Sequence, residues 1–238
     1  MYHYRHDLAL VHDRGYRGHA DRCAPGILEL LQPVKDGLVL EVGCGGGALT
    51  RHLLAAGMRV IATDASPAML GMARMTLGRD ADLRPLTLPG DPLPAADAIV
   101  SVGHVISYLP DAAAVNRALA SMARALRPGG VLAIDICDLE YGEIRHGAEN
   151  LGRVGPDWAV ITEFSAPAPD RFVRDITTFV PDGEGGWRRD SERHENVLVE
   201  VSRIPALLAD HGVRATVGSA FGDAELPRGL RAVTGVKT

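Results

Sequence analysis

The sequence has little of several features that mark specialised classes of protein. It has three cysteines, Cys23, Cys44 and Cys137, and their wide spacing predicts neither a disulfide framework nor a zinc site. No apolar run reaches the ~18 residues of a membrane-spanning helix. The first ten residues lack the basic and apolar segments of a signal peptide. We therefore expect a cytoplasmic protein without a membrane partner.

An excess of basic residues is also missing. Lys and Arg number 25 against 30 Asp and Glu, and the formal net charge is −5. Because a protein that binds nucleic acid usually carries basic residues to neutralise phosphates, nucleic acid is not an expected partner. The chain has 238 residues, of which 46% are hydrophobic, so it can bury the core of one domain with an inserted segment.

Short apolar runs alternate with helical patterns over the first half of the chain. After a polar first segment, a helix is predicted over 24–31, where Pro25 suits a helix start. Further helices are predicted over 48–56, 67–77 and 111–126, and strands over 38–42, 59–63, 83–88, 97–102 and 131–137. Continuous apolar strands separated by helices favour a parallel sheet covered on both faces. Pro85 removes a hydrogen-bond donor from its strand, which should therefore lie at an edge.

The pattern changes after about residue 138. Segments 158–165, 171–180 and 187–201 have the character of long strands joined by short turns, which favours an antiparallel sheet. A short helix over 203–211 and strands over 213–219 and 230–236 follow. We divide the chain into a helical cap segment (1–36), an α/β core (37–138), an antiparallel insertion (139–201) and a completion of the core (202–238).

A glycine-rich turn follows the first strand directly, in VLEVGCGGG at residues 39–47. Glycines let the backbone turn tightly and approach a ligand, at the strand ends where open α/β sheets bind ligands. The next strand ends in Asp64, and an acidic residue there can accept hydrogen bonds from both ribose hydroxyls. The structural alternatives are glycines that only permit packing and an Asp64 that is solvated or caps a helix.

The spacing of the glycines separates two classes of cofactor. A dinucleotide loop has the pattern G-x-G-x-x-G and holds pyrophosphate at a helix N-terminus, whereas here Gly43, Gly45 and Gly47 alternate behind Glu41. The carboxylate of Glu41 would repel a pyrophosphate and suits a ligand with a cationic amino group. The spacing therefore opposes a nicotinamide cofactor.

The segments LEVGCGGG and VIATDASPAML resemble the class I S-adenosylmethionine-dependent methyltransferases. The resemblance continues over residues 38–137 with Gly90-Asp91, ADAIVS and ALRPGGVLAID. It implies an α/β fold with a Rossmann-like, doubly wound, seven-stranded sheet of order 3-2-1-4-5-7-6, in which strand 7 is antiparallel. It also implies that the antiparallel insertion is a lid over the methyl acceptor, that S-adenosyl-L-methionine is the cofactor and that S-adenosyl-L-homocysteine is the product.

The resemblance further implies the cofactor contacts. The methionine portion falls on Glu41, Gly43, Cys44, Gly45 and Gly47, the ribose on Asp64, and the adenine near Ala65, Met69, Thr87 and Leu88, with Ser101 near the transferred methyl group.

Two histidines are candidate general bases, because imidazole titrates near neutral pH. His104 follows the fourth strand, at the mouth of the expected site, and the alternative is a helix-start residue satisfied by the backbone. In the run 190–196, strand alternation places Glu192, His194 and Asn196 on one face, and the alternative is an outward polar face. Candidates for lining the acceptor pocket, with plain packing as the alternative, are Tyr16, His19, Tyr108, Tyr141 and Trp158.

We predict a methyltransferase that acts on an O or N nucleophile of a small molecule, with C as an alternative. A composition rich in Ala, Arg and Gly favours an acceptor from specialised metabolism. A cofactor-binding protein without methyl transfer and an RNA or protein methyltransferase are the rival functions. No catalytic metal is expected, because Asp135 lies inside the fifth strand. The exposed strands of the insertion and the N-terminal segment offer a surface for a homodimer.

Overall fold

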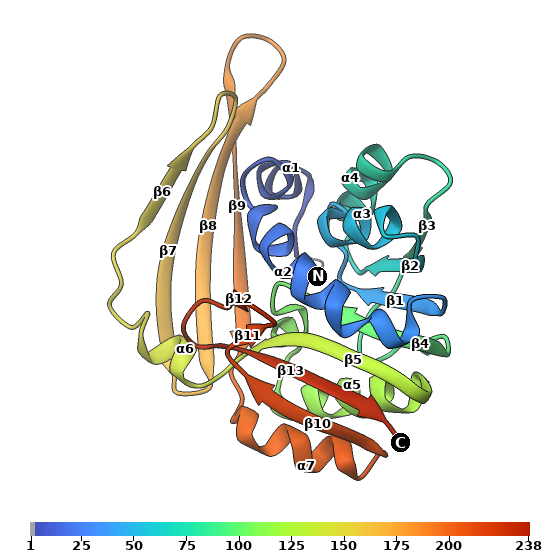
Figure 1. The fold of residues 1–238 in the computed structure, drawn as a ribbon. Helices are drawn as coiled ribbons and strands as arrows, with labels where there is room; N and C mark the ends of the chain where they lie inside the picture. The colour runs from blue at the N-terminus through green and yellow to red at the C-terminus, as the bar shows by residue number, and fades with distance from the viewer. Residues whose placement is uncertain (1–2) are drawn as a thin grey trace.

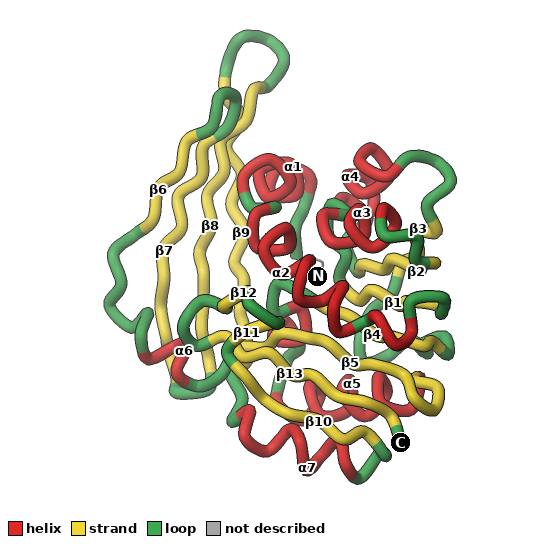
Figure 2. Tube along the Cα trace, viewed as in Figure 1, coloured by secondary structure: helices red, strands yellow, loops and turns green. Residues whose placement is uncertain are grey.

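The computed structural model describes residues 3–238, and a seven-stranded mixed sheet is its central element (Figures 1 and 2). From one edge to the other the strands are β10 (Val213–Gly218), β13 (Leu230–Lys237), β5 (Leu126–Cys137), β4 (Ala96–Ser101), β1 (Leu38–Val42), β2 (Arg59–Asp64) and β3 (Asp82–Pro85). Counted along the chain, this is the predicted order 3-2-1-4-5-7-6, and β13 runs antiparallel to β5. The prediction of the fold is confirmed, and Pro85 lies on the edge strand as expected.

Helices cover both faces of this sheet, because its strands are apolar on both sides. Along β1, Val39 packs into the layer of α2 (Gly18–Leu30), α3 (Ala48–Ala55) and α4 (Pro67–Leu77), whereas Leu40 packs into the layer of α5 (Ala112–Ala125) and α7 (Ile204–Ala209). Each fully buried side chain of this size contributes about 1.5–3 kcal/mol. The two helical layers therefore fix the position of the strand ends, and the site is built on these ends.

Local signals set the bounds of the helices. Ser66 begins α4 by accepting a hydrogen bond from the backbone N–H of Met69 (3.2 Å), and α4 ends at Gly78 with a φ of +85°. Asp111 caps α5 in the same way through the N–H of Ala114 (2.7 Å). These bounds match the predicted helices closely.

The first helices differ from the prediction. α1 (His6–Gly15) forms within the polar first segment, and α2 begins at Gly18, so that Pro25 lies inside a helix instead of at its start. A proline inside a helix costs one backbone hydrogen bond. Here Cys23, Ala24 and Ile27 bury against the sheet and α3, and this burial outweighs the cost.

A second sheet lies beside the core (Figure 1). Its four antiparallel strands are β6 (Leu151–Val154), β7 (Ala159–Ala168), β8 (Arg171–Pro181) and β9 (Trp187–Val197), and α1 packs against β8 and β9. The sequence analysis did not predict β6, which is exposed along its whole length, and it extended β9 to residue 201, where a 3-10 turn (Val201–Arg203) forms instead. Trp158 and Val160 pack with Leu8 and Val11 to join α1 to this sheet.

Short elements complete the chain. They are the 3-10 turns Gln32–Val34 and Val105–Tyr108, the helix α6 (Glu140–Glu143), and a small hairpin of β11 (Ala220–Phe221) and β12 (Ala224–Glu225). The hairpin was not predicted, because two-residue strands carry no periodicity. Within residues 3–238, every helix is too short or too polar to cross a bilayer.

Candidate functional site

The turn between β1 and α3 has a backbone that only glycine adopts readily. Gly43, Gly45 and Gly47 have φ values of +76°, +54° and +84°. A Cβ on Gly43 would lie 2.4 Å from Cγ2 of Val105, so this position has no room for a side chain. The backbone N–H groups of Gly43 and Cys44 both donate to the carbonyl of Thr63 at 2.8 Å. The turn is therefore fixed against the end of β2.

Asp64 lies at that end of β2, facing the turn. Its carboxylate accepts hydrogen bonds from the backbone N–H groups of Gly45 (2.9 Å) and Ser66 (2.8 Å). Burial raises the pKa of Asp64 above its usual range. Because a carboxylate offers about four acceptor sites, Asp64 can still accept hydrogen bonds from a ligand.

A cavity of about 490 Å³ opens over these strand ends, a volume typical of sites for small molecules. Its wall contains predicted cofactor residues from the turn, β2, α4 and the segment after β3, namely Gly43, Gly45, Asp64, Ala65, Met69, Thr87 and Leu88. Residues far apart in the sequence thus meet around one space, as the resemblance implied.

Four other predicted cofactor residues do not line this cavity. The side chain of Glu41 points to α3, where its carboxyl group accepts a hydrogen bond from Thr50 Oγ1 (2.6 Å), and burial raises its pKa to about 7. Ser101 donates to the carbonyl of Val42 (2.8 Å). Cys44 is buried, and Gly47 begins α3. In this structure these residues support the turn from behind.

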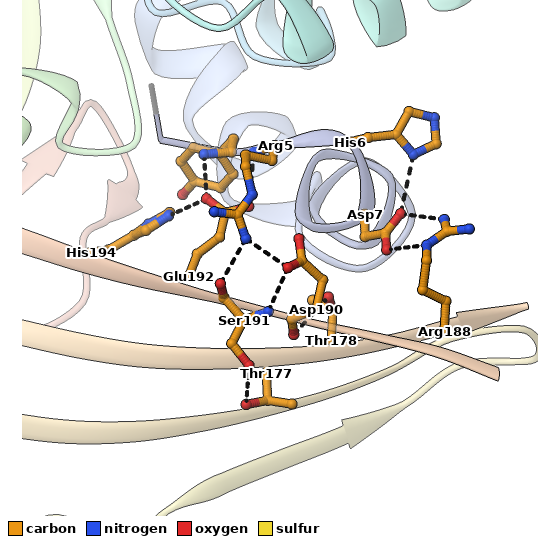
Figure 3. Close-up of polar contacts among 11 residues, drawn as sticks. Arg5, His6, Asp7, Thr177, Thr178, Arg188, Asp190, Ser191, Glu192 and His194 are labelled. Carbon is orange, nitrogen blue, oxygen red and sulfur yellow. Dashed lines mark hydrogen bonds and ion pairs between the residues drawn. The ribbon is translucent and has the colours of Figure 1, made fainter. Parts of the chain in front are cut away.

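The N-terminal segment forms the opposite wall and is tied to β9 (Figure 3). Glu192 accepts hydrogen bonds from the backbone N–H groups of Tyr4 and Arg5, both at 2.8 Å. The carboxylate of Asp7 pairs with the guanidinium of Arg188. These contacts bring Tyr4 into the cavity wall together with His3 and His12, three residues that the sequence analysis missed.

Tyr108 connects this wall to the second sheet. It lines the cavity, and its hydroxyl lies 2.9 Å from that of Tyr4 and 3.4 Å from Nδ1 of His194. The guanidinium of Arg174 also donates to this hydroxyl. Burial raises the pKa of Tyr108 well above its usual value, so the phenol is neutral near pH 7.

His194 is fully buried behind Tyr108, on the inward face of β9 with Glu192 and Asn196. Its Nε2 lies 3.0 Å from Oε2 of Glu192 (Figure 3). Burial lowers the pKa of His194, although the carboxylate of Glu192 acts to raise it. The ring is therefore neutral near pH 7, and with Nε2 donating to Glu192, Nδ1 can accept a proton.

His104 adopts an unusual backbone conformation directly after β4. Its φ is +49°, which non-glycine residues rarely adopt. Asp135 stabilises this turn by accepting hydrogen bonds from the N–H groups of His104 (2.6 Å) and Gly103 (3.0 Å). The imidazole stacks on Tyr108 with centroids 5.7 Å apart, and its buried Nδ1 has no partner among residues 3–238. Burial lowers its pKa well below the usual value.

Of the five residues predicted to line the acceptor pocket, Tyr108 alone belongs to this wall. The other four have structural partners: His19 bonds to Asp135 (2.9 Å), Tyr141 packs on Phe172, Tyr16 lies under the guanidinium of Arg153, and Trp158 packs under α1. The sequence analysis placed these four by residue type, and they are not among the residues that line this cavity.

Comparison with known proteins agrees with this geometry. Residues 39–130, which hold the glycine turn and Asp64, match a family described as a methyltransferase domain. Residues 39–130 are therefore similar to a methyltransferase domain, and the whole chain has the fold of solved S-adenosylmethionine-dependent methyltransferases. Among residues 3–238, no three side chains of His, Cys, Asp or Glu converge as metal ligands would.

Similar proteins come from several bacteria. A malonyl-[acyl-carrier protein] O-methyltransferase of Pectobacterium atrosepticum is 38% identical over 104 residues, 43% of this chain and 40% of that protein. An S-adenosylmethionine-dependent methyltransferase of Clostridium acetobutylicum has a TM-score of 0.79 at 21% identity, covering 97% of both chains. The sugar N-methyltransferase KedS8 of Streptoalloteichus has a TM-score of 0.78 at 24% identity, covering 100% of this chain and 94% of that one.

The chain spans between 40% and 62% of the length of the curated relatives it matches. The solved structures are less than 25% identical and share the fold along nearly the whole chain, the second sheet included.

The residues present fit the cofactor of this family, S-adenosylmethionine. The turn at Gly43 and Gly45 exposes backbone to the cavity, and the carboxylate of Asp64 faces the same space. Leu86 and Leu88 add an apolar surface that can pack against a purine.

Proposed function

We propose that this chain transfers a methyl group from S-adenosylmethionine to an oxygen or nitrogen atom of a small molecule bound in the cavity. One observation carries the proposal: a single cavity is walled on one side by the glycine turn and Asp64, and on the other by Tyr108, with His194 and Glu192 behind it. A sugar N-methyltransferase and an acyl-carrier-protein O-methyltransferase among the similar proteins support both kinds of acceptor atom.

The cofactor side uses the backbone at Gly43 and Gly45 for the methionine portion and Asp64 for the ribose hydroxyls. Ala65, Met69, Thr87 and Leu88 form the adenine side. Glu41, Cys44, Gly47 and Ser101 support this surface from behind. S-adenosylmethionine, when bound, supplies a methyl group on a sulfonium that a nucleophile takes by in-line displacement.

The acceptor side uses Tyr108 to orient the nucleophile and His194 to remove its proton. The proton of the acceptor passes to the hydroxyl of Tyr108 while the hydroxyl proton passes to Nδ1 of His194, and Glu192 stabilises the resulting imidazolium through Nε2. The ring of His104 lacks a carboxylate partner, since Asp135 binds only its backbone N–H. We therefore assign His104 to the shape of the wall and His194 to proton transfer.

The walls also keep water from the reacting atoms. The segment that contains Tyr4 crosses the cavity and is held by Glu192, and α1 is held by Asp7 and Arg188. A closed wall of this kind orients the acceptor and excludes hydrolysis.

The test uses S-adenosylmethionine labelled on its methyl group, incubated with the full chain and with the small-molecule, protein and RNA fractions of a bacterial extract. We expect label in the small-molecule fraction, with an equal amount of S-adenosylhomocysteine. Label confined to RNA or protein would contradict a small-molecule acceptor. Tight binding of S-adenosylhomocysteine without transfer to any fraction would favour the cofactor-binding alternative. Asp64→Ala is the control variant, and because it binds the cofactor more weakly, it should transfer less label.

A further inference from the structure

Arg174 of β8 carries a charge that no carboxylate among residues 3–238 pairs with. It is partly buried on the inward face of the second sheet, directly opposite His194 in the register of β8 and β9. Its guanidinium donates to the hydroxyl of Tyr108 and to Oδ1 of Asn196 (3.0 Å), both of which are neutral. Among residues 3–238 it forms no ion pair, and its buried Nε has no hydrogen-bond partner.

Other arginines of the same sheet show what is missing. Arg193 pairs with Asp175 at 2.7 Å and Arg171 with Glu195 at 3.4 Å, and each pair includes at least one well-exposed side chain. Water weakens such exposed pairs, whereas a charge that is buried without a partner is unfavourable. Arg174, whose Nε is buried, forms no such pair among residues 3–238.

A second unmet donor lies beside Arg174. Asn196 is fully buried, and its Nδ2 has no hydrogen-bond partner among the described residues. Oδ1 of Asn196 accepts a hydrogen bond from Arg174, so the N–H groups of Nδ2 are the part of the amide that lacks a partner. Two donors without partners, one of them charged, thus belong to residues in direct contact, next to Tyr108 of the cavity wall.

The surroundings are short of negative charge as well. Burial, and next the charge of Arg174, lower the pKa of His12 to about 4 and that of His104 well below its usual value. Glu192 is engaged by two backbone N–H groups and His194, and Asp135 by two backbone N–H groups and His19. Neither carboxylate contacts Arg174.

We infer that the methyl acceptor carries an anionic group, a carboxylate or a phosphate, that docks against the guanidinium of Arg174 and the amide of Asn196. A planar guanidinium and an amide N–H present parallel donors that match two oxygens of such a group. Because the guanidinium of Arg174 donates to the hydroxyl of Tyr108, an anionic group held by Arg174 would lie near the atom that Tyr108 orients. This inference rests on the proposed function, because it assigns the substrate class of the same site.

The test follows the Nε–H resonance of Arg174 by NMR in the full chain saturated with S-adenosylhomocysteine. Arg174→Lys assigns the resonance by its disappearance. Inorganic phosphate and acetate are titrated separately at constant ionic strength, and we expect the resonance to shift saturably with at least one of them. The anion with the lower midpoint identifies the group as a phosphate or a carboxylate.

Asn196→Asp is the decisive variant, because it supplies a carboxylate to Arg174 from within the protein. We expect this variant to fold with a raised Tm and to need at least ten times more anion for the same shift. Arg193→Gln, on the outer face of the same sheet, should respond as the wild type does.

Two results would overturn the inference: an Nε–H that responds to neither anion, or an Asn196→Asp variant that responds as the wild type does. Failure of the proposed function is separate, since it would show as an absence of methyl transfer to the small-molecule fraction, which the labelling experiment measures without any added anion.

Discussion

The carboxylate of Asp64 accepts a hydrogen bond from the backbone N–H of Gly45 at 2.9 Å. This contact joins the end of β2 to the glycine turn after β1, so the residue assigned to the ribose also orders the turn assigned to the methionine portion. The two halves of the cofactor surface are therefore expected to respond together to substitution.

Asp64→Ala should weaken the binding of S-adenosylhomocysteine by about 1–3 kcal/mol, because charge-assisted hydrogen bonds to the ribose are lost. Calorimetric titration of both proteins measures the difference. Asp82→Ala, which removes an exposed pair with Arg84 on the edge strand, is the control and should leave the affinity unchanged. An unchanged affinity in Asp64→Ala would remove this residue from the site.

Gly43→Ala should lower stability and cofactor affinity together. The new Cβ would meet Val105 at 2.4 Å, and the residue would retain a φ of +76°. Gly57→Ala is a matched control, since Gly57 has a φ of +80° with nothing within 4 Å of the added carbon. Both variants should lose about 1–2 kcal/mol from backbone strain. Urea denaturation should show a larger loss for Gly43→Ala, and equal losses would mean that the close packing at Val105 is easily relieved.

His194→Ala should lower kcat while sparing the affinity for S-adenosylhomocysteine, because His194 is behind the acceptor side of the cavity. His104→Ala, which alters the shape of the wall, should change KM more than kcat. The reverse pattern, with kcat lost only in His104→Ala, would transfer proton removal to His104. Loss of both activity and cofactor binding in either variant would show a defect in folding.

The pH dependence of kcat gives a second test of His194. Proton removal requires neutral imidazole, and burial lowers the pKa of His194 below 6.5, so activity should persist at pH 6.5 and fall at lower pH. The carboxylate of Glu192 acts to raise this pKa. Glu192→Gln should therefore shift the acid limb to still lower pH and reduce kcat, and an acid limb that does not move would separate Glu192 from the titrating group.

Glu41→Gln should change how stability depends on pH. The folded state raises the pKa of Glu41 from 4.5 to about 7, so this group binds a proton more readily in the folded than in the unfolded chain. Its contribution to stability is therefore complete below pH 4.5 and is lost as the pH rises to about 7. Glu41→Gln cannot ionise, and its stability relative to wild type should increase across this window by on the order of 3 kcal/mol.

Glu140→Gln is the control for Glu41→Gln, with the opposite sign. The guanidiniums of Arg228 and Arg231 lower the pKa of Glu140, so its carboxylate contributes stability at neutral pH that is lost as the pH falls through the lowered pKa. Urea midpoints at pH 4.5 and pH 7 test Glu41→Gln, and a further midpoint below pH 4.5 tests Glu140→Gln. Parallel curves for wild type and Glu41→Gln would contradict a raised pKa of Glu41 in the folded state.

The core sheet could be predicted from the sequence because its signals are local. Leu38–Val42 and Ala96–Ser101 are continuous apolar runs, and the glycines after Val42 mark the turn without reference to the rest of the chain. The order of the strands came from the resemblance to a family, since apolar runs alone do not determine which strands pair.

The acceptor side depended on contacts between distant segments. Tyr4 meets Glu192 across 188 positions of the sequence, and no local pattern indicates that the first residues close the cavity. The alternation over 190–196 did identify one polar face of β9, but whether that face turned inward depended on where α1 packs. Tyr141 and Trp158 pack between elements, and the sequence could not reveal these contacts for the same reason.

The most direct test of the central claim is a crystal structure of the full chain with S-adenosylhomocysteine. We predict the ribose hydroxyls on the carboxylate of Asp64, the adenine against Leu88 and Met69, and the sulfur directed toward Tyr108. A ligand bound outside this cavity, or one whose ribose makes no contact with Asp64, would contradict the account.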